Sequence, residues 1–159
     1  MTASGIPSQR TRKQVYDRDG HACIAAQHPL GDDGWYADRY GTCAGIMTLQ
    51  HRIGRGMGGS KLPGINGVTN LVAMCEHHNG LIERDAAFHR LATACGWSLP
   101  RNRRPALVTA EIPVRYIDGC FLLTPDATRA PIPAALAIEL WQTFGLIDTI
   151  GTLWHGQVA

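Results

Sequence analysis

Apolar and polar positions along the chain alternate with the periods of both helices and strands, and their order predicts an α+β fold. Ser8 is suited to cap a short helix over Gln9 to Arg18, which would end at Asp19-Gly20. Ile46 to Ile53 carries β-branched and apolar residues at alternating positions, which predicts a strand. Asn70 to Cys75 predicts a second short strand or extended segment.

A mainly helical pattern follows the second strand. Apolar residues between Glu76 and Ala94 recur at helical spacing, and Gly96 marks the end of that helix. The loop between the two strands, Gly54 to Gly67, is rich in glycine. An irregular stretch that opens at Cys23 predicts a long loop, anchored by the aromatic residues Trp35 and Tyr36 or Tyr40.

The last third of the chain predicts a β-hairpin followed by a helix. Residues 112–116 and 120–124 flank Asp118-Gly119, a dipeptide typical of hairpin turns. Pro133 predicts the start of a final helix over residues 134–144, which the next glycine ends.

These elements predict four regions. We expect a flexible tail over residues 1–7, a motif-bearing core over 8–99, a proline-bracketed linker over 100–105 and a C-terminal hairpin and helix over 106–159. The C-terminal region would pack on the core, form a homodimer or bind a protein partner, and the sequence leaves these three open.

Composition narrows the class of protein. A chain of 159 residues that is 45% hydrophobic builds one modest core, and 18 Gly with 9 Pro predict many turns. No apolar run approaches the roughly 20 residues that cross a membrane, and the first residues have no apolar stretch of the signal-peptide type. We therefore expect no membrane association and a cytoplasmic location.

Positive charge is concentrated in the part of the chain that carries the motifs. Through Arg104 there are 13 Lys or Arg against 8 Asp or Glu, whereas the remaining residues hold 2 against 5. This distribution favours contact with phosphate groups, although a solvated basic surface is the competing account.

Three cysteines and a histidine have the spacing of a structural zinc site. Cys75 and His78 form a C-x2-H pair at the start of a predicted helix, and this spacing favours His78 over His77. Cys23 and Cys43 would complete a Cys3His site and staple the N-terminal segment to the core. The alternative is a set of ordinary buried cysteines beside a surface histidine pair. Two further cysteines lack a partner pattern and are expected in the core: Cys95 and Cys120.

His51 and Asn70 stand at the two ends of the glycine-rich loop. A neutral imidazole at position 51 could take a proton from water, provided its other ring nitrogen is fixed by a hydrogen bond. The Asn70 amide could bond backbone groups on both sides of the loop and close it. A purely structural role is the more common one for either residue alone.

The order and spacing of these elements resemble the HNH endonuclease family, whose ββα-metal fold has this layout. The matching segments are Arg12 to Cys23, Leu49 to Lys61 and Asn70 to Glu83. They cover roughly the first 85 residues. The whole chain is most similar to small HNH proteins of actinobacterial phages, which implies a bacterial host cell as its location. The resemblance implies that His51 is the general base, Asn70 the central asparagine and Asn79 a ligand of a catalytic metal ion.

One position departs from the family pattern. The residue before the base is commonly Asp or His, a ligand of the same ion, and here it is Gln50. Mg2+ favours carboxylate oxygens, so amides at positions 50 and 79 alone would bind it weakly. Glu83 stands four residues after Asn79, on the same helical face, and we hypothesise that it completes the site with Gln50. A solvated helix charge is the alternative for Glu83.

The expected function is metal-dependent hydrolysis of DNA phosphodiester bonds, with a structural Zn2+ and a catalytic Mg2+ or other divalent ion. The alternative is a catalytically weak or inactive HNH scaffold that binds DNA or a protein partner. Basic residues near the motifs are the expected DNA contacts: Arg10, Arg12, Lys13, Arg52, Arg55 and Lys61.

Overall fold

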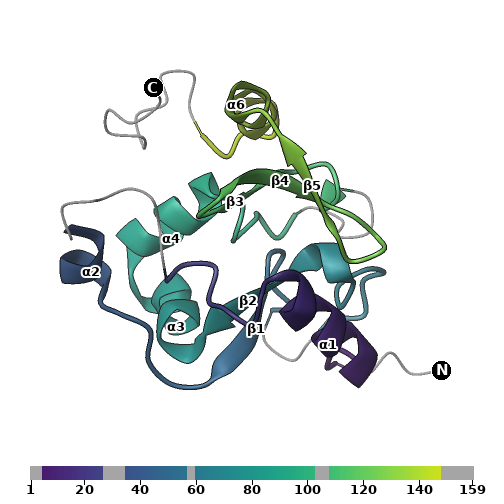
Figure 1. Cartoon of the computed structure of the whole chain (residues 1–159), viewed down its shortest axis with the longest axis horizontal. Coiled ribbons are helices and arrows are strands. Elements are labelled where there is room, and N and C mark those ends of the chain that lie inside the picture. The colour runs from purple at the N-terminus through teal and green to yellow at the C-terminus, as the bar shows by residue number, and fades with distance from the viewer. Residues whose placement is uncertain (1–4, 27–34, 57–59, 103–107, 148–159) are drawn as a thin grey trace.

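The described part of the chain forms two small antiparallel sheets and a set of short helices, a fold of the mixed α+β class (Figure 1). A computed structural model describes residues 5–26, 35–56, 60–102 and 108–147. The elements are α1 (Gln9–Arg18), α2 (Trp35–Tyr40), β1 (Met47–His51), η1 (Val68–Asn70), β2 (Leu71–Cys75), α3 (Glu76–Arg84), α4 (Ala86–Ala94), β3 (Val114–Tyr116), β4 (Gly119–Leu123), β5 (Arg129–Ile132) and α6 (Ala134–Thr143).

The first sheet consists of β1 and β2, and α3 follows β2 directly. The strands pair antiparallel from Met47 opposite Cys75 to His51 opposite Leu71. Every residue of β2 is buried, in line with its uninterrupted apolar sequence. Cys75 ends the strand and caps α3, because its sulfur accepts a hydrogen bond from the backbone N–H of His78. This order of strand, strand and helix places the end of β1 beside α3.

Helix α1 has the predicted bounds, and its C-terminal end is fastened to β2. The Ser8 hydroxyl accepts the N–H of Thr11 at 3.1 Å, as expected of an N-cap. Arg18 forms a buried ion pair with Asp19 and donates to the carbonyls of Val68 and Leu71. The first helix is therefore held against the segment that leads into β2.

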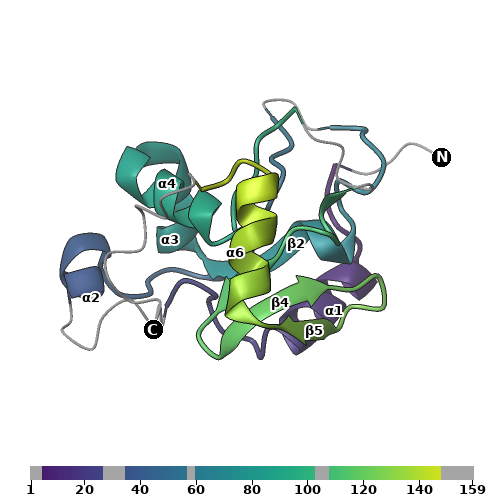
Figure 2. The ribbon, with the colours of Figure 1, turned by 90° about the horizontal axis from the view of Figure 1, so that it is seen from above.

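The second sheet has the order β3-β4-β5 and lies between α6 and the β1–β2 part of the molecule (Figures 1 and 2). The predicted hairpin is confirmed, with Tyr116 opposite Gly119 across a two-residue turn. The third strand, β5, was not predicted. The final helix α6 has Pro133 at its N-cap, and Trp141 from this helix donates its ring N–H to the carbonyl of Pro113.

The two halves of the chain share their apolar cores. One buried cluster joins Cys23, Met74 and Phe88 to Val114 and Leu123 of the second sheet. The hydroxyl of Tyr116 also donates to the carboxylate of Asp19, at 2.8 Å. The C-terminal hairpin thus packs on the N-terminal part of the chain.

Two predicted stretches differ in the structure. The segment expected to be an irregular loop contains α2, and two residues of this helix, Tyr36 and Tyr40, are buried. The helix expected over residues 76–94 is two helices, because Asp85 has extended backbone angles and its carboxylate caps α4 through the N–H of Phe88. The loop prediction for residues 27–34 lies outside the described residues. The same holds for residues 1–4 of the predicted tail, 57–59 of the glycine-rich loop, 103–107, which include the end of the predicted linker, and 148–159 of the C-terminal region.

Within the described ranges, no helix has both the length and the apolar character that crossing a membrane requires.

Candidate metal centre and cleft

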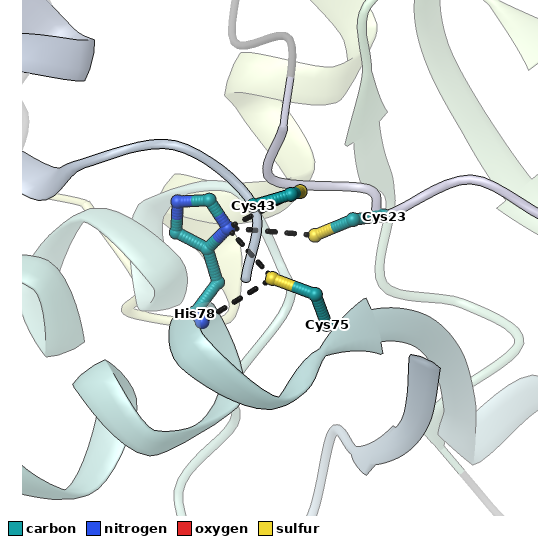
Figure 3. A group of neighbouring side chains, drawn as sticks. All are labelled: Cys23, Cys43, Cys75 and His78. Carbon is teal, nitrogen blue, oxygen red and sulfur yellow. Dashed lines mark hydrogen bonds between the residues drawn. The ribbon is translucent and has the colours of Figure 1, made fainter. Parts of the chain in front are cut away.

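Four side chains from separate segments converge to form what we call the Cys3His cluster. Cys23 follows α1, Cys43 precedes β1, and Cys75 and His78 flank the junction of β2 and α3. Figure 3 shows all four pointing toward one another. Their sulfur atoms and the imidazole nitrogen lie within 4.8 Å of one another. The predicted ligand set is therefore brought together in space.

The distances in the Cys3His cluster fit a tetrahedral metal ion. Nδ1 of His78 lies 3.6 Å from the sulfur of Cys23, 3.8 Å from that of Cys43 and 3.2 Å from that of Cys75. A zinc tetrahedron with ordinary bond lengths has sulfur-to-nitrogen edges of about 3.6 Å. Three thiolates and one imidazole are also a preferred donor set for Zn2+. The cluster can hold a metal ion such as zinc.

The surroundings of the cluster shift the pKa values of its members in different directions. Burial raises the pKa of the Cys23 thiol, and it also raises the pKa of Cys43. Burial acts in the same direction on Cys75, but hydrogen bonds from the backbone of His78 and Ala44 and from the neighbouring sulfurs lower its pKa overall. Burial lowers the pKa of His78, which keeps the imidazole neutral, the form that binds a metal.

The competing histidine and the two remaining cysteines lie elsewhere. His77 contacts the carbonyl of Tyr40 through Nε2, at 2.7 Å, and so links α3 to α2. Cys95 and Cys120 are buried in the core, as predicted.

A cleft of about 570 Å3 opens where β1 ends beside α3, and we call it the His51 cleft. A second hollow, of about 320 Å3, adjoins it. Leu49, His51, Arg55 and Asn79 line both, so they lie where the two hollows meet. The remaining polar residues that line the His51 cleft are Gln50, Glu83, His89, Ser98 and Arg101.

His51 is 9% exposed and its ring is held by Asn66, a residue that the sequence analysis did not single out. Nε2 of His51 lies 2.9 Å from Oδ1 of Asn66. An amide oxygen only accepts, so Nε2 carries the proton and Nδ1 keeps a lone pair. Burial lowers the pKa of His51, and the cation of Arg55 acts in the same direction, whereas the Asn66 bond opposes them. The imidazole is therefore neutral near pH 7, with one nitrogen able to accept a proton.

Asn70 closes the loop that follows His51. Its Oδ1 accepts the N–H of Ile53 at 2.8 Å, and its Nδ2 donates to the carbonyls of Ile53 and Ile65. The side chain is fully buried. These bonds on both sides of the loop are those expected of it from the sequence.

Asn79 is oriented by Thr48, which the sequence analysis also missed. The Thr48 hydroxyl donates its proton to the carbonyl of Met74, at 2.8 Å. Because its only proton is already donated, this hydroxyl accepts a hydrogen bond from Nδ2 of Asn79, also at 2.8 Å. The amide nitrogen of Asn79 is thereby turned toward Thr48, and Oδ1 remains the acceptor atom of a side chain that lines both hollows.

Gln50 and Glu83 line the His51 cleft together with Asn79. Gln50 is half-buried at the end of β1, and Glu83 is exposed on the last turn of α3. The three residues that we hypothesised to share an ion therefore face one cavity.

Arg52 is not a DNA contact, and this prediction is wrong. The side chain is fully buried and its guanidinium donates to backbone carbonyls of four residues at 3.0 Å or less: Thr69, Gly96, Thr109 and Ile112. Its place in the sequence beside His51 gave no sign of burial, but this residue, which directly follows β1, lies in the core. Arg52 instead ties β1 to the segment that leads into β3.

The other basic candidates are at the surface. Arg12 lines the second hollow and Arg55 lines both hollows, so each of these two cations shares a hollow with His51. Three more are exposed and line neither hollow, and Lys13 among them pairs with Asp17: Arg10, Lys13 and Lys61.

Comparison of the chain with protein-family models, with curated proteins and with solved structures gives no match in any of the three.

Proposed function

We propose that this protein is a metal-dependent DNA endonuclease of the HNH type, which hydrolyses phosphodiester bonds. The observation that carries the proposal is the shared cleft of His51 and Asn79. One residue comes from the end of β1 and the other from α3, and each is held by its own hydrogen-bond partner. A ββα arrangement with a base and an oxygen ligand facing each other suits this reaction.

His51 would act as the general base. With its Nε2 proton bonded to Asn66, the lone pair on Nδ1 is free to take a proton from water as that water attacks the phosphorus. The lowered pKa keeps this nitrogen unprotonated at neutral pH. Asn70 supports the base indirectly, because its hydrogen bonds fix the loop that begins after His51.

Asn79, with Glu83 and Gln50, would hold the catalytic divalent ion. Their side chains offer two amide oxygens and a carboxylate, which are oxygen donors suited to Mg2+ or Mn2+. The ion would supply positive charge against the phosphate and the leaving 3′-oxygen. Thr48 contributes by holding the amide of Asn79 in one orientation.

The Cys3His cluster would carry a structural zinc. It joins the segment after α1 and the segment before β1 to the start of α3, and α3 carries Asn79. A metal at this point would fix the helix against β1, and therefore the width of the His51 cleft.

Surface charge supports a DNA backbone as the substrate. The two hollows meet at His51, and the cations of Arg12 and Arg55 line them. Arg101 also lines the His51 cleft, next to Gly54. Cations that line the same hollows as the base are suited to bind phosphates near the scissile bond.

The test is cleavage of supercoiled plasmid by the zinc-loaded full chain in Mg2+, Mn2+ and Ni2+. We expect nicked or linear product with the native chain and a loss of about 100-fold or more in His51→Ala. His21→Asn is the matched control, since His21 is an exposed histidine just beyond α1 and lines neither hollow. Equal cleavage by the native chain and His51→Ala, or none by either protein, would refute the proposal.

The glutamine at position 50 favours a second candidate, a scaffold that binds DNA without cutting it. Gln50 lines the His51 cleft at the position where the resemblance implies an acidic or histidine ligand. If the native chain binds DNA without cleaving it and Gln50→Asp gains cleavage, the second candidate is correct. If the native chain already cleaves and Gln50→Ala leaves the rate within about twofold, Gln50 has no part in the site.

A further inference from the structure

His89 is a cleft residue to which neither the sequence nor the reaction above assigns a role. It lies in the first half of α4, is exposed, and lines the same cleft as Asn79 and Glu83. The break between α3 and α4 at Asp85 makes this possible, since α4 turns back and brings His89 against the last turn of α3.

One hydrogen bond fixes the chemical state of the His89 ring. Nδ1 lies 3.0 Å from the backbone carbonyl of Ile82. A carbonyl oxygen only accepts, so Nδ1 carries the proton in the neutral ring and Nε2 carries the lone pair. Metal-binding histidines in proteins have this arrangement, in which the nitrogen that does not bind the metal donates to a carbonyl and sets the ring's orientation.

The acceptor atoms of Asn79 and His89 are therefore each set by a hydrogen bond of the same side chain. Thr48 directs Oδ1 of Asn79 away from itself, and Ile82 leaves Nε2 of His89 as the acceptor. Glu83 stands beside Ile82 in the chain and contributes a carboxylate. One nitrogen, one amide oxygen and one carboxylate make three protein ligands, with the remaining positions open to water or phosphate.

We propose that Nε2 of His89 is a ligand of the catalytic divalent ion, together with Asn79 and Glu83. The catalytic role of this ion rests on the proposed endonuclease function. Binding of the ion depends only on the three ligand residues. His89 supplies the strong ligand that Gln50 does not.

The ligand set also determines which metal is preferred. Mg2+ favours oxygen ligands only, whereas Mn2+ accepts an imidazole beside its oxygen ligands and Ni2+ binds imidazole more strongly still. We therefore expect the His51 cleft to bind Mn2+ and Ni2+ more tightly than Mg2+, and the margin to depend on His89.

The experiment is a calorimetric titration of the zinc-loaded full chain with Mn2+ alone, followed by the same titration with Mg2+. His89→Asn is the main variant, because its amide can still donate to the Ile82 carbonyl while Nε2 is removed. We expect its dissociation constant for Mn2+ to rise about 10- to 100-fold, with little change for Mg2+. Glu83→Gln should weaken both metals.

The two control variants remove the same kinds of group, an imidazole and a carboxylate, at positions outside the cleft. His21→Asn replaces an exposed histidine at the end of α1, where its φ of +53° suits asparagine. Glu139→Gln replaces an exposed carboxylate on α6. Both should bind Mn2+ as the native chain does, and thermal midpoints of all variants check that they remain folded.

The outcomes separate this inference from the endonuclease proposal. Unchanged Mn2+ affinity in folded His89→Asn overturns the role of His89, whether or not the native chain cuts plasmid. Weakened Mn2+ binding in that variant, with no plasmid cleavage by any protein, supports the metal site and overturns the endonuclease proposal.

Discussion

Replacing Arg52 by methionine tests the packing of the molecule most sharply. Methionine keeps an unbranched side chain of similar length but removes the guanidinium. Four backbone carbonyls then lose a buried donor, those of residues 69, 96, 109 and 112. An unsatisfied buried acceptor costs at least about 1 kcal/mol, so the free energy of unfolding should fall by about 4 kcal/mol. For a chain of this size that corresponds to a drop of roughly 8 to 16 °C in the thermal midpoint.

The assay is urea and thermal unfolding of the native chain, Arg52→Met and Arg55→Met, followed by DNA binding. Arg55 stands three residues later and lines the surface hollows, so its replacement should change stability by no more than about 0.5 kcal/mol while weakening DNA binding. Arg52→Met should lower the stability of the protein and leave the DNA affinity of the folded protein unchanged. A stable Arg52→Met protein with reduced DNA affinity would refute the assignment of Arg52 to the core.

Four further predictions concern the metal centre and the base. Purified protein should carry one zinc per chain by elemental analysis, and removing it with a chelator should lower the free energy of unfolding by at least about 4 kcal/mol; an unchanged unfolding midpoint would count against the Cys3His site. The cleavage rate should rise with pH through a midpoint below 6.5 and then level off, because His51 must be neutral and its pKa is lowered; a midpoint above 6.5 in a pH–rate profile would contradict this. Stability gained from the neutral ring should be fully present above pH 6.5 and decline as the pH falls toward the folded pKa. Asn66→Ala should lower kcat by about 10- to 100-fold. Asn66→Asp should move the acid midpoint of the pH–rate profile upward, since a carboxylate favours the charged imidazole. Unchanged kinetics in both variants would show that Asn66 has no part in the site.

The elements that sequence predicted well are those set by local signals. Helix α1 begins at the Ser8 cap and ends before Gly20, whose φ is +66°. The β3–β4 turn follows from its dipeptide signal, and Gly119 adopts a φ of +141° there. Helix α6 likewise begins after Pro133. In each case a few neighbouring residues determine the backbone, so no knowledge of the rest of the fold is needed.

The elements that sequence missed depend on distant partners. Helix α2 has only six residues and no periodic pattern of its own. Its rings at Tyr36 and Tyr40 are held by His78 and Phe88, which lie far along the chain. The break at Asp85 was hidden because apolar residues recur on both sides of it, although an aspartate three residues before Phe88 is a capping signal.

The same division applies to the candidate site. The Cys3His cluster and the loop-closing bonds of Asn70 were predictable, because their residue types and spacing carry the chemistry. Thr48, Asn66 and His89 were not, because each acts through one hydrogen bond that only the folded chain creates. The burial of Arg52 depends in the same way on carbonyls that converge from three other segments.

The central claim, that the protein cuts DNA with His51 as the base, is tested most directly by chemical rescue. Single-turnover cleavage of a plasmid in Mn2+ would be measured for the native chain and for His51→Ala, with and without added imidazole. We predict cleavage by the native chain, a rate about 100-fold or more lower in His51→Ala, and partial recovery when imidazole replaces the missing base. Equal rates in the two proteins, or no cleavage by the native chain, would contradict the account.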